Sequence, residues 1–180
     1  MKAVKSYCSC WVILMVTLLP FIAGCTPLSE NGPMTAGLLQ PVTGRDLRIV
    51  TGQTVYVPAY SQIFYGQASR TMDLGVTLAI HNTDLNAPII IRSVRYYNTD
   101  GLLVRSYISD PMSISPLATT GFLVEEGDVQ GGWGANFIVE WIAEQPVYEP
   151  VIEAIMISTS GSQGISLLST GRVISQTIQS

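Results

Sequence analysis

Cysteine and histidine are scarce in this sequence, and their scarcity excludes several kinds of chemistry. The three cysteines are Cys8, Cys10 and Cys25, so residues 26–180 contain neither a disulfide nor a thiol. His81 is the only histidine, whereas a catalytic zinc site needs two or three histidines or a cysteine partner. Because the sequence also lacks a phosphate-binding loop, we expect a protein with no cofactor and no bound metal.

Positive charge is also scarce. The only lysines are Lys2 and Lys5, and beyond residue 24 seven arginines stand against 13 acidic residues, a net charge of about −6. A chain with this balance and no basic run is a poor match for nucleic acid or for an anionic bilayer surface. We therefore expect no nucleic-acid partner.

The N-terminus carries the pattern of an export signal. Two lysines precede an apolar segment that runs from Cys10 to Ile22, which is the layout of a secretory signal peptide. The segment is shorter than the roughly 20 apolar residues that a membrane-spanning helix needs. Residues 1–24 are therefore predicted to be a signal peptide, with an uncleaved membrane anchor as the alternative.

The signal ends in a lipidation motif. The run from Leu18 closes with Ala23-Gly24-Cys25, and the Cys25 thiol is the one side chain there nucleophilic enough to take a diacylglyceryl group as a thioether. The segment resembles a bacterial lipobox that is cleaved before Cys25. Acyl chains, palmitate among them, would hold the protein in the lipid bilayer, because each buried CH₂ contributes about 0.8 kcal/mol. An ordinary signal peptide with an incidental cysteine is the alternative.

The expected location is the cell membrane or the outer membrane, with the protein exported and lipid-anchored. Thr26 follows the cysteine, in place of the aspartate that resembles an inner-membrane retention signal of enteric bacteria. In a Gram-negative cell the periplasmic face of the outer membrane is therefore favoured.

Residues 25–52 are predicted to form a flexible tether that begins at the lipidated cysteine. The segment is rich in Pro and Gly, with only Leu38-Leu39 and Leu47–Val50 as apolar interruptions. About 27 flexible residues span roughly 25–30 Å root-mean-square, enough to lift a domain clear of lipid headgroups. The alternative for its last part is the first strand of the domain.

The rest of the chain alternates with the two-residue period of β-strands, and helical periodicity is almost absent. Asp100-Gly101 supplies the positive φ that a hairpin turn requires. Strands are predicted at Thr54–Ala59, Asp73–His81, Ile89–Tyr97, Leu102–Ile108, Gly121–Glu125, Asn136–Ile142, Val151–Ser158 and Ile165–Ile174.

Short strands separated by frequent turns predict one all-β domain. The expected fold is an antiparallel immunoglobulin-like β-sandwich of about seven to nine strands over residues 53–176. A small barrel is the competing architecture.

Five segments of this domain are distinctive in combination: Val55–Ser61, Tyr96–Tyr107, Gly131–Trp141, Pro146–Ala154, and Gly164–Ser166 with Gly171–Ile174. Together they resemble an uncharacterised family of bacterial lipoproteins, known as a domain of unknown function. The resemblance covers about Val55 to Ile174. It implies one exported lipoprotein domain and carries no known activity or catalytic residue.

The loop from Glu125 to Asn136 is the most unusual stretch of the domain, with four glycines and Trp133 between two predicted strands. Loops at the end of a sandwich display binding residues, and an exposed Trp is an amphipathic anchor for a protein or a sugar. The predicted binding residues are therefore Trp133, Asn136, Glu126 and Asp128. The alternative is a wide turn whose glycines satisfy the backbone while Trp133 folds back on the core.

The acidic residues of this loop allow a second interpretation. Glu125, Glu126 and Asp128 are oxygen ligands that Ca²⁺ accepts, and Asn136 would complete the shell. No EF-hand spacing is present, and acids beside a turn are more often solvated. We therefore expect no metal here.

Catalytic alternatives depend on few residues. A Ser-His-Asp triad would have to use His81. A glycoside hydrolase would need Glu140 and a second carboxylate, Glu126 or Glu153, about 5–10 Å away. An outward Glu opposite an arginine is more simply a cross-strand ion pair. We therefore expect that the protein is not an enzyme.

The sequence thus favours a membrane-anchored, exported lipoprotein whose non-catalytic β-sandwich binds another component of the cell envelope, a protein or a glycan. The alternatives are a glycan hydrolase that uses Glu140 and a lipoprotein that binds a small ligand. If Tyr60, Tyr65 and Trp133 converge at one end of the sandwich, they form an aromatic patch for the partner.

Overall fold

The computed structural model describes residues 39–44, 46–160 and 163–178, so the predicted signal peptide, Cys25 and the tether up to residue 38 lie outside the described residues. The described chain consists of strands and one short 3₁₀ helix, and none of its segments is a helix long and apolar enough to cross a membrane. The elements are β1 (Gln40–Pro41), β2 (Thr51–Pro58), β3 (Gln62–Tyr65), β4 (Gln67–Asp73), β5 (Gly75–His81), β6 (Ile89–Tyr97), β7 (Leu103–Ser106), β8 (Met112–Ile114), β9 (Thr119–Val124), η2 (Gly132–Gly134), β10 (Asn136–Ala143), β11 (Val151–Ser158), β12 (Ile165–Thr170) and β13 (Arg172–Ile178).

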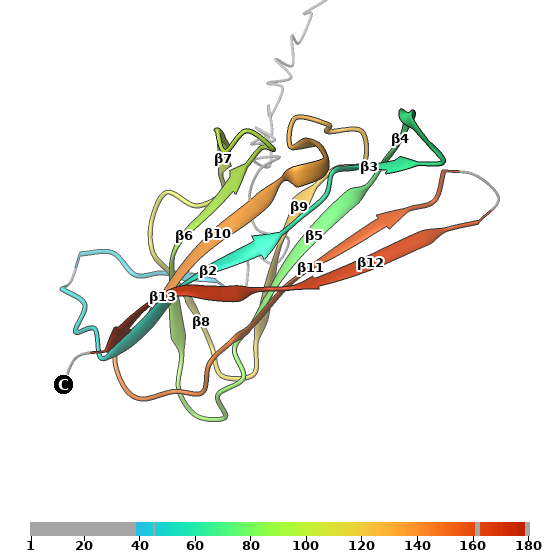
Figure 1. Ribbon diagram of the computed structural model, residues 1–180. Coiled ribbons are helices and arrows are strands. Elements are labelled where there is room, and N and C mark those ends of the chain that lie inside the picture. The colour runs from blue at the N-terminus through green and yellow to red at the C-terminus, as the bar shows by residue number, and fades with distance from the viewer. Residues whose placement is uncertain (1–38, 45, 161–162, 179–180) are drawn as a thin grey trace, which may run out of the picture.

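Two antiparallel sheets pack face to face, and a separate hairpin extends one end of the molecule (Figure 1). The larger sheet has the order β1-β8-β6-β10-β2-β13, with β7 also paired to β6, and the smaller has the order β12-β11-β5-β9. The hairpin is the β3–β4 pair. The predicted all-β antiparallel sandwich is confirmed. The strands outnumber the expected seven to nine because short pairs such as β1 with β8 leave no alternating pattern in the sequence.

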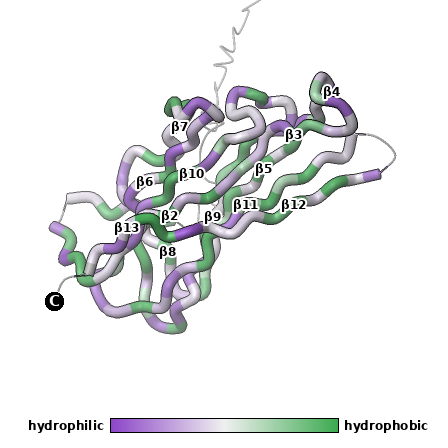
Figure 2. Tube along the Cα trace, viewed as in Figure 1, coloured by the Kyte–Doolittle hydropathy of each residue, from purple (hydrophilic) through white to green (hydrophobic). Residues whose placement is uncertain are grey.

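The core lies between the two sheets. Val76, Leu78 and Ile80 of β5 are fully buried, as their alternation predicted, and Phe137 and Val139 of β10 meet them from the larger sheet. Figure 2 shows hydrophobic and hydrophilic residues alternating along the strands. Because each buried aliphatic or aromatic side chain contributes about 1.5–3 kcal/mol, this two-sided core is sufficient to hold the sandwich together without a disulfide.

One continuous segment joins the two sheets along one edge of the sandwich (Figure 1). We expected a single strand over Ile165–Ile174, but β12 pairs with β11 in the smaller sheet and β13 pairs with β2 in the larger. The change of sheet occurs at Gly171, whose N–H donates to Ile152 O at 2.8 Å. A Cβ there would lie 2.6 Å from Val55 Cγ1 and 2.8 Å from Ile152 O. The single-strand prediction is therefore wrong at this glycine.

The domain includes residues before 53. β1 pairs with β8, Leu39 is buried in the core, and β2 begins at Thr51. Val42 N also donates to Pro111 O at 2.9 Å. The described end of the segment expected to be a tether thus packs on the sandwich and supplies part of its first strands, which was the alternative for this segment.

Two polar side chains tie together the loops at the end of the sandwich opposite the β3–β4 hairpin. Asn82 is buried and its amide donates to three loop carbonyls, those of Ala87, Ile114 and Ser115, at 2.8–3.2 Å. The Asp84 carboxylate accepts from three backbone N–H groups, those of Asn86, Ala87 and Tyr148, at 2.8–3.1 Å. These N–H groups lower the pKa of Asp84 below its ordinary value, because they stabilise the charged form.

Candidate functional site

The loop between β9 and β10 is held on two sides by side chains from other loops. Ser61, just before β3, exchanges hydrogen bonds with Gly132: Ser61 N donates to Gly132 O at 3.2 Å, and Gly132 N donates to Ser61 Oγ at 3.0 Å. Thr99, in the β6–β7 turn, donates from its N–H and its hydroxyl to Gly131 O at 2.9 and 3.0 Å. The same hydroxyl accepts from Gly134 N at 3.0 Å. The η2 turn is thereby fixed between the β3–β4 hairpin and the β6–β7 turn, and we call this the apical end.

Two glycines of this loop are required by their surroundings. A Cβ at Gly131 would lie 1.8 Å from the Tyr96 hydroxyl, and Gly132 has φ +75°. Tyr96 is fully buried beneath the loop, and this burial raises its pKa to about 12. The phenol is therefore neutral at physiological pH, and the loop packs directly on the core.

Trp133 projects from this anchored turn into solvent. Its side chain is 55% exposed, so it does not fold back on the core as the alternative proposed. Its ring lies 6.1 Å from that of Phe64 in β3, at an interplanar angle of 51°. Phe64 is 52% exposed. The apical end thus displays a pair of aromatic side chains, although exposed aromatic surface is costly in water.

The expected aromatic patch forms with different members. Tyr65 is exposed on the same hairpin, and the Arg70 guanidinium lies 5.2 Å from its ring centroid. Tyr60 instead packs against the core, and its backbone N–H lies 3.2 Å from Met156 Sδ. Phe64 takes the place that we expected for Tyr60.

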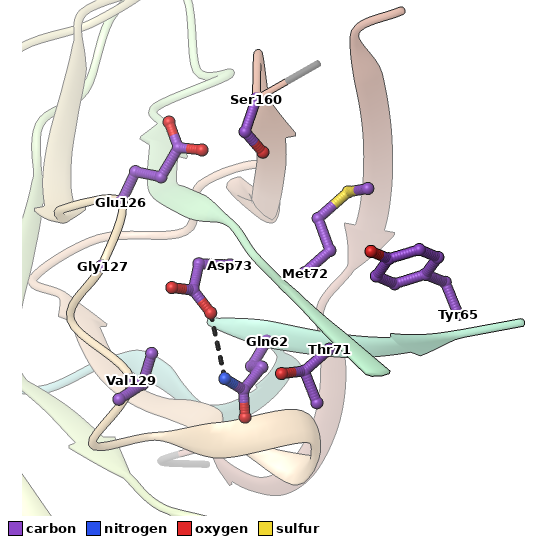
Figure 3. A pocket seen from close by; sticks show the side chains of 9 residues that line it. All are labelled: Gln62, Tyr65, Thr71, Met72, Asp73, Glu126, Gly127, Val129 and Ser160. Carbon is purple, nitrogen blue, oxygen red and sulfur yellow. Dashed lines mark hydrogen bonds between the residues drawn. The ribbon is translucent and has the colours of Figure 1, made fainter. Parts of the chain in front are cut away.

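A groove opens at the apical end, between the β3–β4 hairpin and the β9–β10 loop (Figure 3). Its volume is about 730 Å³. Gln62 Nε2 donates to Asp73 Oδ1 at 3.0 Å across the hairpin, and the Ser158 hydroxyl donates to Glu126 Oε1 at 2.8 Å. We call this hollow the apical groove; its lining residues are Gln62, Tyr65, Thr71, Met72, Asp73, Glu126, Gly127, Val129 and Ser160.

The strand register connects the groove with the aromatic pair. Gln62 lies opposite Asp73 and Phe64 lies opposite Thr71, so these four side chains share one face of the hairpin. Phe64 therefore stands next to the polar groups of the groove, with Trp133 beside it. Sequence reasoning missed Phe64, Gln62 and Asp73, because the short alternation in residues 62–65 is ended by Gly66 and is too brief to be recognised as a strand.

The four predicted binding residues lie in different surroundings. Trp133 and Glu126 belong to the apical end. Asp128 is mostly buried and forms an ion pair with Arg105, Oδ2 to Nη2, at 2.9 Å. Asn136 faces outward from β10, between Pro58 and Tyr97 on the adjacent strands. Asp128 therefore supports the loop, and Asn136 lies on the outer face of the larger sheet.

The acidic residues of the loop do not converge on one point. Within residues 39–44, 46–160 and 163–178, no three His, Cys, Asp or Glu side chains are grouped to hold a metal ion. Asp128 is turned toward Arg105, whereas Glu126 is turned toward Ser158. The calcium interpretation of this loop therefore has no set of ligands in the described chain.

The residues named for catalysis also lie apart. Glu140 forms an ion pair with Arg95 on the outer face of the larger sheet. Glu153 belongs to the smaller sheet, where one oxygen lies 3.8 Å from His81 Nε2. His81 Nδ1 lies 2.9 Å from the Thr119 hydroxyl. Because Glu140 and Glu153 lie on opposite sheets, they do not flank a common groove.

A second apolar surface lies on the outer face of the smaller sheet. Leu168, Ile155, Thr77 and Leu123 follow one another in register across β12, β11, β5 and β9, and the three aliphatic side chains are exposed. Aliphatic side chains alone fix no orientation for a ligand, so we favour the apical end, where polar and aromatic groups are combined.

Comparison with curated proteins and with solved structures gives no information about function. No curated protein matches the chain. Among solved structures, the crystal structure of Thermotoga maritima 1070 is similar, at 11% sequence identity and a TM-score of 0.36. The match covers 67% of this chain and 92% of the other. The likeness is too distant to support an argument about function.

A family model matches the greater part of the chain and confirms the resemblance to a domain of unknown function. The match extends over residues 52–174, from the first residues of β2 into β13. It therefore includes the whole apical end. The chain belongs to this family, DUF3124, described as a protein of unknown function.

Proposed function

We propose that this protein is an exported lipoprotein, anchored in the bilayer through acylated Cys25, whose sandwich binds another component of the cell envelope at its apical end. The observation that carries the proposal is the exposed Trp133–Phe64 pair on an anchored turn. Tyr, Trp and Phe supply much of the energy at binding surfaces, since they bury a large area with few rotatable bonds.

The hydrogen bonds beneath the turn support a binding role. Ser61 and Thr99 hold the backbone on either side of Trp133, so the turn loses little conformational freedom when a partner is bound. Such preorganisation increases affinity because less ordering entropy is lost in the complex.

We propose binding in preference to the two alternatives. A glycan hydrolase would need two carboxylates across one groove, whereas Glu140 is paired with Arg95 on the outer face of the larger sheet. A small-ligand carrier would need an enclosed apolar cavity, whereas the interior here is filled by large side chains such as Trp141, Tyr96 and Phe122.

Membrane anchoring is tested by replacing Cys25→Ser in the full chain and following metabolic labelling with radioactive palmitate. We expect the variant to lose the label and to leave the membrane fraction, because it lacks the thiol that is acylated. Cys10→Ser, which alters the signal but not the acylation site, serves as the control. Full labelling of the Cys25→Ser variant would contradict the anchor.

Binding is tested by cross-linking in intact cells followed by mass spectrometry. We expect one discrete envelope component to be recovered with the wild type and lost with Trp133→Ala. Tyr148→Ala is the matched control, because this side chain is an exposed aromatic near the opposite end, at 71% exposure against 55% for Trp133. Equal recovery with the Trp133→Ala variant would exclude the apical end as the contact.

A further inference from the structure

We propose that the apical groove binds an uncharged oligosaccharide, with Trp133 and Phe64 stacked on the sugar rings and Asp73 and Glu126 accepting hydrogen bonds from their hydroxyl groups. This inference rests on the proposed binding function and names the ligand class. It combines two observations, an exposed aromatic pair and a polar hollow whose residues Gln62, Thr71 and Asp73 share a face of the β3–β4 hairpin with Phe64.

The aromatic pair supplies a surface for the apolar faces of sugar rings. More than half of each side chain is exposed, so a ring face is accessible to a ligand without any rearrangement of the core. The C–H face of a pyranose covers such a ring and removes its apolar area from water, which is the main favourable contribution to binding.

The carboxylates of the groove are already oriented. Asp73 Oδ1 accepts from Gln62, and Glu126 Oε1 accepts from Ser158. Within the described chain no hydrogen bond engages Asp73 Oδ2 or Glu126 Oε2, so each can accept from a ligand hydroxyl. A hydrogen bond to a charged acceptor is stronger than one between neutral groups. Thr71 and Ser160 add hydroxyl groups to the same lining (Figure 3).

Charge decides against other ligand classes. Among the described residues that line the groove, two are acidic and none is basic, so phosphate and carboxylate ligands would be repelled. A hard cation would leave the aromatic pair without a role. A neutral, hydroxyl-rich ligand can both stack on the aromatic pair and donate hydrogen bonds to the carboxylates of the groove.

The test uses the acylated protein in detergent micelles, titrated separately with chitohexaose, cellohexaose and maltohexaose by calorimetry and tryptophan fluorescence. Trp133 is exposed whereas Trp141 is buried, so a fluorescence change on titration reports mainly on the apical end. We expect at least one hexasaccharide to bind with a dissociation constant below about 1 mM. Binding should weaken at least about tenfold in Trp133→Ala and in Phe64→Ala.

The carboxylates of the groove are tested with a matched pair of variants. Glu126→Gln should weaken binding, whereas Glu125→Gln, which alters a neighbouring exposed carboxylate outside the lining, should not. Asp73→Asn should act like Glu126→Gln. Thermal unfolding of each variant establishes that it is folded, and Trp133→Ala, at an exposed position, keeps the test valid if Phe64→Ala fails to fold.

The outcomes separate this inference from the proposed function. If none of the three hexasaccharides binds, the glycan assignment is overturned, while recovery of a cross-linked partner that is lost in Trp133→Ala preserves the binding function. Binding of spermine in place of any sugar also overturns it, in favour of a cationic ligand. Sugar binding that is unchanged in Trp133→Ala and Asp73→Asn overturns the groove as its location.

Discussion

Single residues of the apical loop are constrained by what lies beneath them. Gly131 is compatible with the fold because it has no side chain where the Tyr96 hydroxyl lies. Trp133, two residues later, contacts Phe64 at the surface and carries no such constraint from the core. Neighbouring positions in one loop are therefore constrained differently, Gly131 by the core beneath it and Trp133 only by its surface neighbour.

Gly131→Ala should destabilise the domain by about 1–3 kcal/mol, since the added methyl group forces Tyr96 or the loop to move. The measurement is urea unfolding of the full-length protein. Gly164→Ala is the control, because its nearest neighbour would be 3.7 Å away, and it should be nearly neutral. Equal free energies of unfolding for the Gly131→Ala variant and the wild type would contradict this, and would show that Tyr96 can move aside without loss of stability.

Asp84 makes stability dependent on pH. Its pKa is lowered in the fold by the backbone N–H groups of Asn86, Ala87 and Tyr148, so its contribution is fully present above its ordinary pKa of 3.8 and is lost as the pH falls through the lower folded value. Asp84→Asn should therefore lower the Tm at pH 7, and the difference from the wild type should shrink below pH 4.

The check is a series of thermal unfolding curves between about pH 2 and pH 7. The exposed Asp46→Asn variant should follow the wild type throughout that series. A constant Tm difference for Asp84→Asn across the range would contradict a role for the charged carboxylate.

At the scale of elements, the edge formed by β12 and β13 connects the two sheets. β12 continues into β13 with only Gly171 between them, and the chain leaves one sheet for the other at this point. Without a Cβ at residue 171, the two sheets approach closely here, with Val55 on one side and Ile152 on the other. At this edge the two sheets are therefore joined by the polypeptide chain itself as well as by side-chain packing.

Gly171→Ala should lower the free energy of unfolding by about 1–3 kcal/mol, because its Cβ would enter the space of Val55 and the Ile152 carbonyl. Chemical denaturation measures this change. Gly75→Ala, within β5 and with its nearest neighbour at 3.6 Å, is the matched control and should change little. A comparable loss in both variants would indicate a general cost of replacing strand glycines.

At the scale of the whole molecule, packing alone accounts for the sandwich. Its large buried side chains come from both sheets, and the chain after residue 25 has no cysteine. Domains of this size bury enough apolar area to be stable without cross-links. The fold therefore does not depend on the redox state of the compartment in which the protein resides.

The Tm of the purified protein should accordingly be the same with and without dithiothreitol. Thermal unfolding followed by circular dichroism gives the comparison, and a disulfide-bonded exported protein measured in parallel shows that the reductant is active. A lower Tm in dithiothreitol would reveal a disulfide, and a disulfide at Cys25 would mean that this thiol is not acylated.

Local patterns in the amino-acid sequence determine much of this protein. The two-residue alternation in β5, β6, β10 and β11 placed the strands and their buried faces, since that period depends only on neighbouring residues. Asp100-Gly101 likewise predicted the β6–β7 turn, where Gly101 has φ +76°. The unusual composition of the loop around Trp133 also predicted candidate binding residues at what is the apical end.

Only the tertiary structure decided which distant residues the apical loop and the sheet edges contact. Phe64 meets Trp133 across about seventy residues of chain, Gly131 is required by Tyr96, and Gly171 by Val55. The apical groove exists because the β3–β4 hairpin is fixed against the β9–β10 loop through Ser61. Each of these contacts joins segments distant in sequence, and a local period carries no information about which distant segment will lie opposite.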